Sequence, residues 1–117
     1  MILAVDSEPE VLRTIAAMLR HDGYEVNAAA SAAGAEHLIH YGLKPDALVT
    51  EFLLSDSDGV ALANRIRSTI PDLPVLILTT GGVELPGDLA RNHLSVLSKP
   101  FTVQSIGQAV LILIRHS

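Results

Sequence analysis

Short apolar runs alternate along the chain with longer segments in which apolar residues recur at helical spacing. Most of these runs are continuously apolar, a pattern typical of strands in a parallel sheet that is covered by helices on both faces. Five strands are predicted, over residues 2–5, 24–29, 47–50, 74–79 and 95–98.

The longer segments predict helices, and one of them differs from the rest. Residues 81–94, between the fourth and fifth strands, hold three glycines and a proline, so we expect a short or irregular helix there, over residues 88–93. The limits of the other four helices are a stop at Gly23, a cap at Ser31 followed by Gly42, an end at Ile70 before Pro71, and a cap at Thr102.

The strict alternation of strands and helices predicts an α/β fold. We expect a doubly wound parallel sheet of five strands, with right-handed crossovers and helices on both faces. The chain has 117 residues, 49% of them hydrophobic and 18% charged, which fits a single domain over residues 1–117. In such sheets the working site lies at the carboxyl ends of the strands.

Composition excludes several classes of function. The net charge is −5 and the 8 Lys and Arg residues are scattered, so we expect no direct contact with nucleic acid. The absence of cysteine excludes disulfides, thiolate metal sites and thiol nucleophiles. No apolar run reaches about 18 residues and no basic leader follows Met1, so we expect neither a membrane span nor secretion, but a cytoplasmic protein.

Charged and hydroxyl side chains gather where the predicted strands end. In a parallel sheet these ends share one edge, so three carboxylates, a hydroxyl group and an amine should converge from distant parts of the chain. The residues concerned are Asp6, Ser7 and Glu8 after the first strand, Glu51 after the third, Thr79 and Thr80 after the fourth, and Lys99 after the fifth.

Four stretches carry a family resemblance. They are ILAVDSEPEVLRTIAAMLRHDGYEV from residue 2, PDALVTEFLLSDSDGVALANRIR from residue 45, LPVLILTT from residue 73 and LSKPF from residue 97. In this order and spacing the chain resembles a receiver domain of the response-regulator family, which acts in two-component phosphorelay signalling. The resemblance covers essentially all 117 residues and implies the flavodoxin-like receiver fold, with strand order 2-1-3-4-5.

The resemblance also implies a chemistry. Receiver domains accept a phosphoryl group on an aspartate carboxylate, assisted by a lysine and by a magnesium ion that prefers octahedral oxygen ligands. Carried over residue by residue, Asp6 matches the first acid of the acidic pair, Ser7 replaces the second, and Glu51 stands at the phosphoacceptor position. Leu53 would supply a backbone carbonyl to the metal, and Lys99 matches the lysine that precedes a proline. Thr79 matches the switch hydroxyl, and Val96 stands at the switch aromatic position.

Two of these positions depart from the family pattern. Glu51 is one methylene longer than aspartate, and a displacement of that order costs about a hundredfold in rate. Ser7 lacks the charge of a magnesium ligand, which weakens a site formed by Asp6, Glu51 and Leu53, so that no cofactor is certain. Glu8 is an alternative ligand, although its charge also suits the start of a helix. We therefore expect a degenerate receiver, or pseudo-receiver, that is phosphorylated poorly or not at all.

Three interpretations of Glu51 stay open at this stage. The favoured one is a structural ion pair with Lys99; the others are a built-in mimic of the phosphorylated state that draws Thr79 inward, and an active phosphoacceptor that uses magnesium. Asp56 and Asp58 are expected to shape and cap the loop into the third helix. A small enzyme or ligand-binding domain on the same fold is a further alternative, but the chain has neither a phosphate-binding loop nor a recognisable activated serine, so we expect no enzyme.

The last helix is apolar around most of its circumference, in the stretch AVLILI. A helix of this kind is buried or forms an interface. We expect protein contacts near Leu111, Ile112 and Ile114, either in a homodimer or with a histidine kinase or an effector or output domain.

Overall fold

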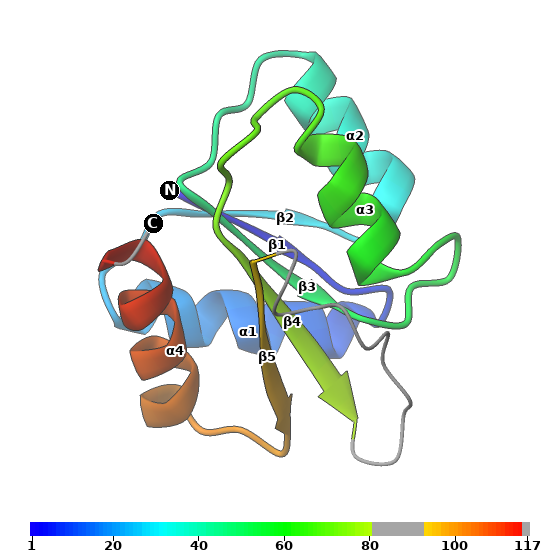
Figure 1. The fold of residues 1–117 in the computed structure, drawn as a ribbon. Helices are drawn as coiled ribbons and strands as arrows, with labels where there is room; N and C mark the ends of the chain where they lie inside the picture. Colours follow the sequence, from blue (N-terminus) through cyan, green and yellow to red (C-terminus); the bar gives the residue numbers. More distant parts are fainter. Residues whose placement is uncertain (81–92, 116–117) are drawn as a thin grey trace.

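The computed structural model describes residues 1–80 and 93–115. Their sheet has five parallel strands in the order β2-β1-β3-β4-β5, which confirms the predicted fold (Figure 1). The strands differ from the predicted ranges by no more than two residues at either end. They are β1 (Ile2–Val5), β2 (Val26–Ala29), β3 (Ala47–Glu51), β4 (Val75–Thr80) and β5 (Leu94–Lys99).

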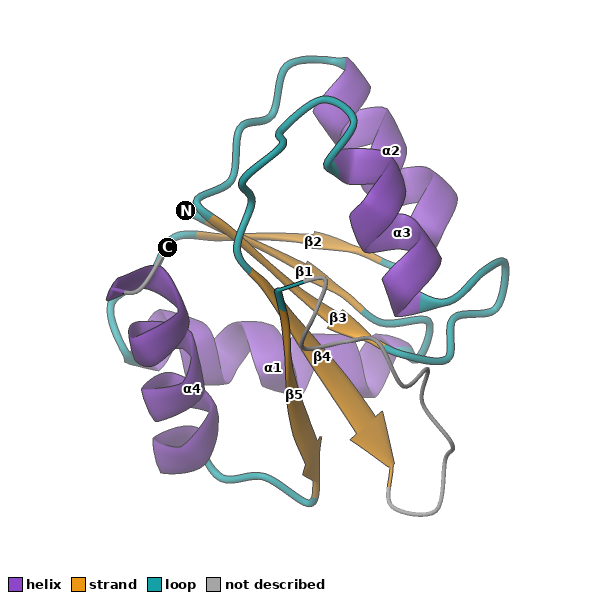
Figure 2. Cartoon of the chain, viewed as in Figure 1, coloured by secondary structure: helices purple, strands orange, loops and turns teal. Residues whose placement is uncertain are grey.

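Helices cover both faces of this sheet (Figure 2). Within the described residues they are α1 (Pro9–His21), α2 (Ala32–His40), α3 (Gly59–Ile66) and α4 (Val103–Arg115). Helices α1 and α4 lie on one face, and α2 and α3 lie on the other. The short helix predicted over residues 88–93 lies outside the described residues except for His93, which is in a turn. None of the described helices has the length and apolar character needed to cross a bilayer.

Strand β1 shows how the two layers of the core are divided. Leu3 and Val5 pack in one apolar cluster with α2 and α3, whereas Ile2 and Ala4 pack in the other with α1 and α4. All four side chains are fully buried. Burial on both faces is the reason why the strand has no polar alternation in the sequence.

The predicted helix limits are confirmed at three of the helices. Gly23 follows α1 with a φ of 93°, a conformation that glycine adopts without steric cost. Ser31 caps α2, since its Oγ accepts a hydrogen bond from the Gly34 N–H at 2.9 Å. At the start of α4, Thr102 Oγ1 accepts from the Ser105 N–H at 3.0 Å, and Ser105 Oγ accepts from the Thr102 N–H at 2.8 Å.

The third helix is shorter than predicted. It ends at Ile66 rather than at Ile70, and residues 67–70 continue as turns in which the Ile70 N–H donates to the Ile66 carbonyl at 2.9 Å. The hydrogen bonds change to three-residue spacing at this point, since the Ser68 N–H donates to the Arg65 carbonyl at 3.2 Å and the Thr69 N–H to the Ile66 carbonyl at 2.9 Å. Ile70 still packs against the core, which is why the apolar spacing resembled a longer helix.

Candidate functional site

The carboxyl edge of the sheet brings together the charged residues that the sequence singled out. Asp6 follows β1 directly, Glu51 ends β3, and Lys99 ends β5. The two carboxylates are almost fully buried, with exposed fractions of 2% for Asp6 and 6% for Glu51. Buried carboxylates are costly unless a cation or hydrogen bonds compensate their charge, so their surroundings decide what this site can do.

Lys99 supplies that compensation. Its Nζ lies 2.7 Å from Glu51 Oε2 and 3.8 Å from Asp6 Oδ2. Neither of these oxygens accepts a hydrogen bond; the contact with Glu51 is close enough for an ion pair but lacks hydrogen-bond geometry. The lysine side chain is itself only 25% exposed. One ammonium group is therefore shared by two buried carboxylates, which makes it the principal electrostatic support of the site.

The backbone around Asp6 and Glu51 is held in place independently of Lys99. Asp6 Oδ1 accepts a hydrogen bond from the Glu8 N–H at 2.9 Å. Gly59, which opens α3, lies so close to Glu51 that a Cβ built on it would be 2.6 Å from the Glu51 carbonyl oxygen. Only a residue without a side chain allows the start of α3 to approach the end of β3 this closely.

Ser7 and Glu8 contribute differently from an acidic pair. Ser7 Oγ accepts a hydrogen bond from the Ser55 N–H at 2.8 Å and donates one to Ser55 Oγ at 3.2 Å. Glu8 is exposed, precedes α1 and makes no capping hydrogen bond with its side chain. The acids at the metal-binding positions are thus Asp6 and Glu51, and both face the lysine ammonium.

This donor set is weaker for magnesium than one with an acidic pair and a free acceptor carboxylate would be. Magnesium requires near-octahedral oxygen ligands, usually including carboxylates that are free to bind it. Within residues 1–80 and 93–115 no group of three or more His, Asp or Glu side chains is placed to hold a metal ion. The Lys99 ammonium is already in contact with Glu51. Leu53 lies on the following loop, bridged to Asp58, and its side chain is 58% exposed.

The two residues expected to relay a signal lie in β4 and β5. Thr79 is buried, and its hydroxyl donates to the Thr80 carbonyl at 3.3 Å rather than to Glu51. Val96 is 39% exposed on the edge strand β5.

The predicted contact surface on the last helix divides into two parts. Leu111 and Ile112 are exposed, as a surface for partners requires. Ile114 instead is partly buried and packs against the core cluster under α4. The physical reason is helical spacing, because Ile114 lies one turn beyond the fully buried Val110 and shares its face.

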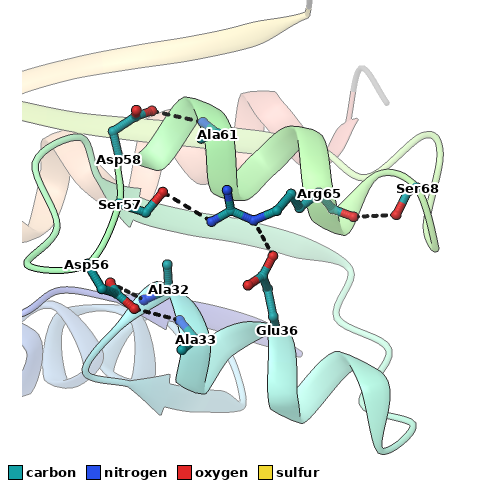
Figure 3. A network of polar contacts seen from close by, with 9 residues as sticks. All are labelled: Ala32, Ala33, Glu36, Asp56, Ser57, Asp58, Ala61, Arg65 and Ser68. Atoms are coloured by element: carbon teal, nitrogen blue, oxygen red, sulfur yellow. Dashed lines mark hydrogen bonds and ion pairs between the residues drawn. The ribbon is translucent and has the colours of Figure 1, made fainter.

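The loop after Glu51 contains a contact that the sequence did not predict. Asp58 caps α3 as expected, accepting from the Ala61 N–H at 2.8 Å. Asp56, expected to serve the same helix, instead accepts hydrogen bonds from the N–H groups of Ala32 and Ala33 at the start of α2 (Figure 3). The two partners are about two dozen residues away in the chain, and no local sequence pattern indicates such a pairing.

Comparison with known proteins identifies the family. The sequence model of the response regulator receiver domain matches residues 2–111. The chain is 30% identical to response regulator MprA of Mycobacterium leprae over 118 residues, which cover 99% of this chain and 51% of that protein. The chain thus spans about half the length of the curated relatives that it matches first.

Solved structures agree with this assignment. A putative response regulator from Chloroflexus aurantiacus is 34% identical, with a TM-score of 0.85 over 97% of this chain and 96% of that chain. A receiver domain protein from Clostridium thermocellum is 27% identical, with a TM-score of 0.82 over 98% of this chain and 94% of that one. The chain belongs to the response regulator receiver domain family of two-component signalling.

Proposed function

We propose that this chain is a receiver-type signalling module that acts through protein contacts and is phosphorylated poorly or not at all. The observation that carries the proposal is the buried contact of 2.7 Å between Glu51 Oε2 and Lys99 Nζ, at the position where a receiver would accept phosphate. This contact supports a structural role for the charge of Glu51 rather than a reactive one.

Three physical arguments support a loss of phosphorylation. Phosphoryl transfer to a carboxylate requires an unhindered oxygen in line with the donor, and Glu51 places its carboxylate about one carbon–carbon bond beyond that of an aspartate. The lysine that would stabilise the transferred group is already paired with the acceptor. Ser7 Oγ is engaged with Ser55, and the two acids at the metal-binding positions, Asp6 and Glu51, both face the Lys99 ammonium.

A protein partner is the second part of the proposal. Val96 on β5 and Leu111 and Ile112 on α4 expose apolar side chains on neighbouring elements. Such a surface suits a homodimer, a histidine kinase or an output domain better than it suits a small substrate. Light scattering at micromolar concentration tests the homodimer, which a purely monomeric result would exclude. We do not assign this domain an enzymatic activity.

Phosphorylation can be tested directly. The wild-type chain is incubated with acetyl phosphate and magnesium, and the intact mass is measured. We expect no gain of a phosphoryl group in wild type and a gain in the double variant with Glu51→Asp and Ser7→Asp, because that variant restores the shorter acceptor and the second acid.

The matched control is the variant with Ser7→Asp and Glu51→Gln, which has the second acid but no acceptor. It should gain no mass, which would assign any modification of the double variant to position 51. Ready modification of the wild-type chain, lost in the Glu51→Gln variant, would overturn the proposal and establish Glu51 as an active phosphoacceptor.

A further inference from the structure

The first turn of α2 is satisfied by side chains from two different parts of the chain. A helix offers no internal acceptor to its first backbone N–H groups. Here Asp56 Oδ1 accepts from the Ala32 N–H at 3.0 Å and Asp56 Oδ2 accepts from the Ala33 N–H at 2.9 Å, while Ser31 caps the next amide. A carboxylate at this end also interacts favourably with the helix dipole.

The loop that carries Asp56, residues 52–58 between β3 and α3, is also attached on its other side. Ser55 is bound to Ser7 in the segment after β1 through its N–H and its hydroxyl group, at 2.8 and 3.2 Å. Arg65 of α3 donates to Ser57 Oγ at 3.1 Å and pairs with Glu36 of α2 (Figure 3). Three separate segments of the chain, namely the segment after β1, α2 and α3, therefore meet at this loop.

We propose that Asp56 is a positioning residue that joins this loop to α2, and that Ser7 holds the loop from the opposite side, so that α2, the loop and the segment after β1 order as one unit. The loop begins directly after Glu51, so this unit fixes the chain that leaves the acceptor position. The inference concerns how the loop is held, and it does not depend on whether Glu51 accepts phosphate.

Charge supports the same assignment. The pKa of Asp56 is lowered because its carboxylate accepts the backbone N–H of Ala33 and that of Ala32, with a smaller effect from the Arg65 guanidinium. Ionised Asp56 is therefore the form that the α2 amides select. Water that replaced the carboxylate would satisfy the two amides without joining them to the covalent chain of the loop.

Amide hydrogen exchange measured by NMR on the full chain tests this unit. In Asp56→Ala we expect the Ala32 and Ala33 amides to exchange about tenfold faster or more, since each loses a bond to a charged acceptor. We also expect the Ser55 amide, which does not contact Asp56, to exchange about twofold faster or more, because residues of one network are coupled. Asp56→Asn keeps one acceptor oxygen and should restore part of the protection at all three amides.

Asp58→Ala is the matched control, because it removes the other aspartate of the same loop, which caps only α3. It should accelerate exchange of the Ala61 amide and leave those of Ala32, Ala33 and Ser55 unchanged. If Asp56→Ala affects Ala32 and Ala33 but not Ser55, or if Asp58→Ala accelerates all of them equally, the unit does not exist and the inference fails. If the alanine variant does not fold, the exchange rates of the same amides are compared between wild type and Asp56→Asn, which preserves the size of the side chain.

Discussion

Glu51 and Asp56 lie on either side of the same short stretch of chain, yet they hold their negative charge in opposite ways. Glu51 is 6% exposed, and its Oε2 contacts the lysine ammonium without a hydrogen bond. Asp56 is exposed, and both of its oxygens accept hydrogen bonds from backbone amides. The first carboxylate depends on a single cation, and the second on fixed dipoles.

This difference predicts where each group matters. A buried charge that loses its cation keeps the full cost of desolvation. Changes in the charged cluster of Asp6, Glu51 and Lys99 should therefore act on the stability of the whole domain. An exposed carboxylate that is lost leaves amides that water can reach, so changes at Asp56 should act mainly on local order. The roles of the charged cluster and of the loop can therefore be distinguished by how large the mutational effects are and how far they extend through the domain.

Replacing Lys99 should have the largest effect. In Lys99→Met the carboxylates of Asp6 and Glu51 lose their common cation, and we expect the free energy of unfolding at neutral pH to fall by about 3 kcal/mol. Denaturant unfolding followed by circular dichroism measures this change. Adding Glu51→Gln to Lys99→Met should recover at least half of the loss, because one of the unpaired charges is then removed.

Lys44→Met is the control for that experiment, since Lys44 is an exposed lysine for which the structure gives no ion pair. Its effect should stay within about 0.5 kcal/mol, as for most surface substitutions. A Lys99→Met variant as stable as the Lys44→Met variant would contradict the view that Lys99 neutralises buried charges.

An intermediate effect on stability is expected at Gly59, which lies against Glu51 of the charged cluster and directly follows the loop. An alanine there would bring its Cβ to 2.6 Å from the Glu51 carbonyl oxygen, a contact with backbone that cannot turn away. We expect Gly59→Ala to lower the free energy of unfolding by about 1 to 3 kcal/mol. In Gly34→Ala the new Cβ meets the end of the Ser31 side chain at 3.1 Å, so that control should lose less. Equal losses of unfolding free energy in the two variants would show that the close approach at Gly59 has no special effect on stability.

The fold could be predicted from the sequence because its signals are local. The apolar runs at 2–5 and 47–50 are continuous since both faces of the sheet are covered, and Ser31 and Thr102 cap the helices that they precede. The end of α3 was missed because Ile70 keeps the apolar spacing of a helix while packing from a turn. Apolar periodicity reports burial, and it does not distinguish a last helical turn from a series of turns.

The site could be predicted only in part. The meeting of Asp6, Glu51 and Lys99 follows from the topology, since all three lie at strand ends. The partners of Asp56 did not follow, because an aspartate in a loop is compatible with any nearby amide, and the choice between α2 and α3 is made by the packing of the two helices. The partial burial of Ile114 did not follow either, since an apolar helix face does not reveal which side meets the core.

The smallest effect on stability is expected at Asp56. The pH dependence of this effect distinguishes the loop from the charged cluster. The pKa of Asp56 is lowered from its ordinary value of 3.8 by the amides of Ala33 and Ala32 and, to a lesser extent, by Arg65. A carboxyl group with a lowered pKa contributes stability that is present above its ordinary pKa and is lost as the pH falls through the lowered value. Asp56→Asn cannot ionise, so the difference in unfolding free energy between wild type and this variant should be constant near neutral pH and narrow below about pH 4.

The groups facing Asp56 keep this test specific. Arg65 and its partner Glu36 are present in both proteins, so the comparison changes only the residue at position 56. Denaturant unfolding at a series of pH values measures this difference in unfolding free energy. If the difference instead widened as the pH fell, protonated Asp56 would be the form bound to α2, and the contrast between a carboxylate held by dipoles and one held by a lysine would be wrong.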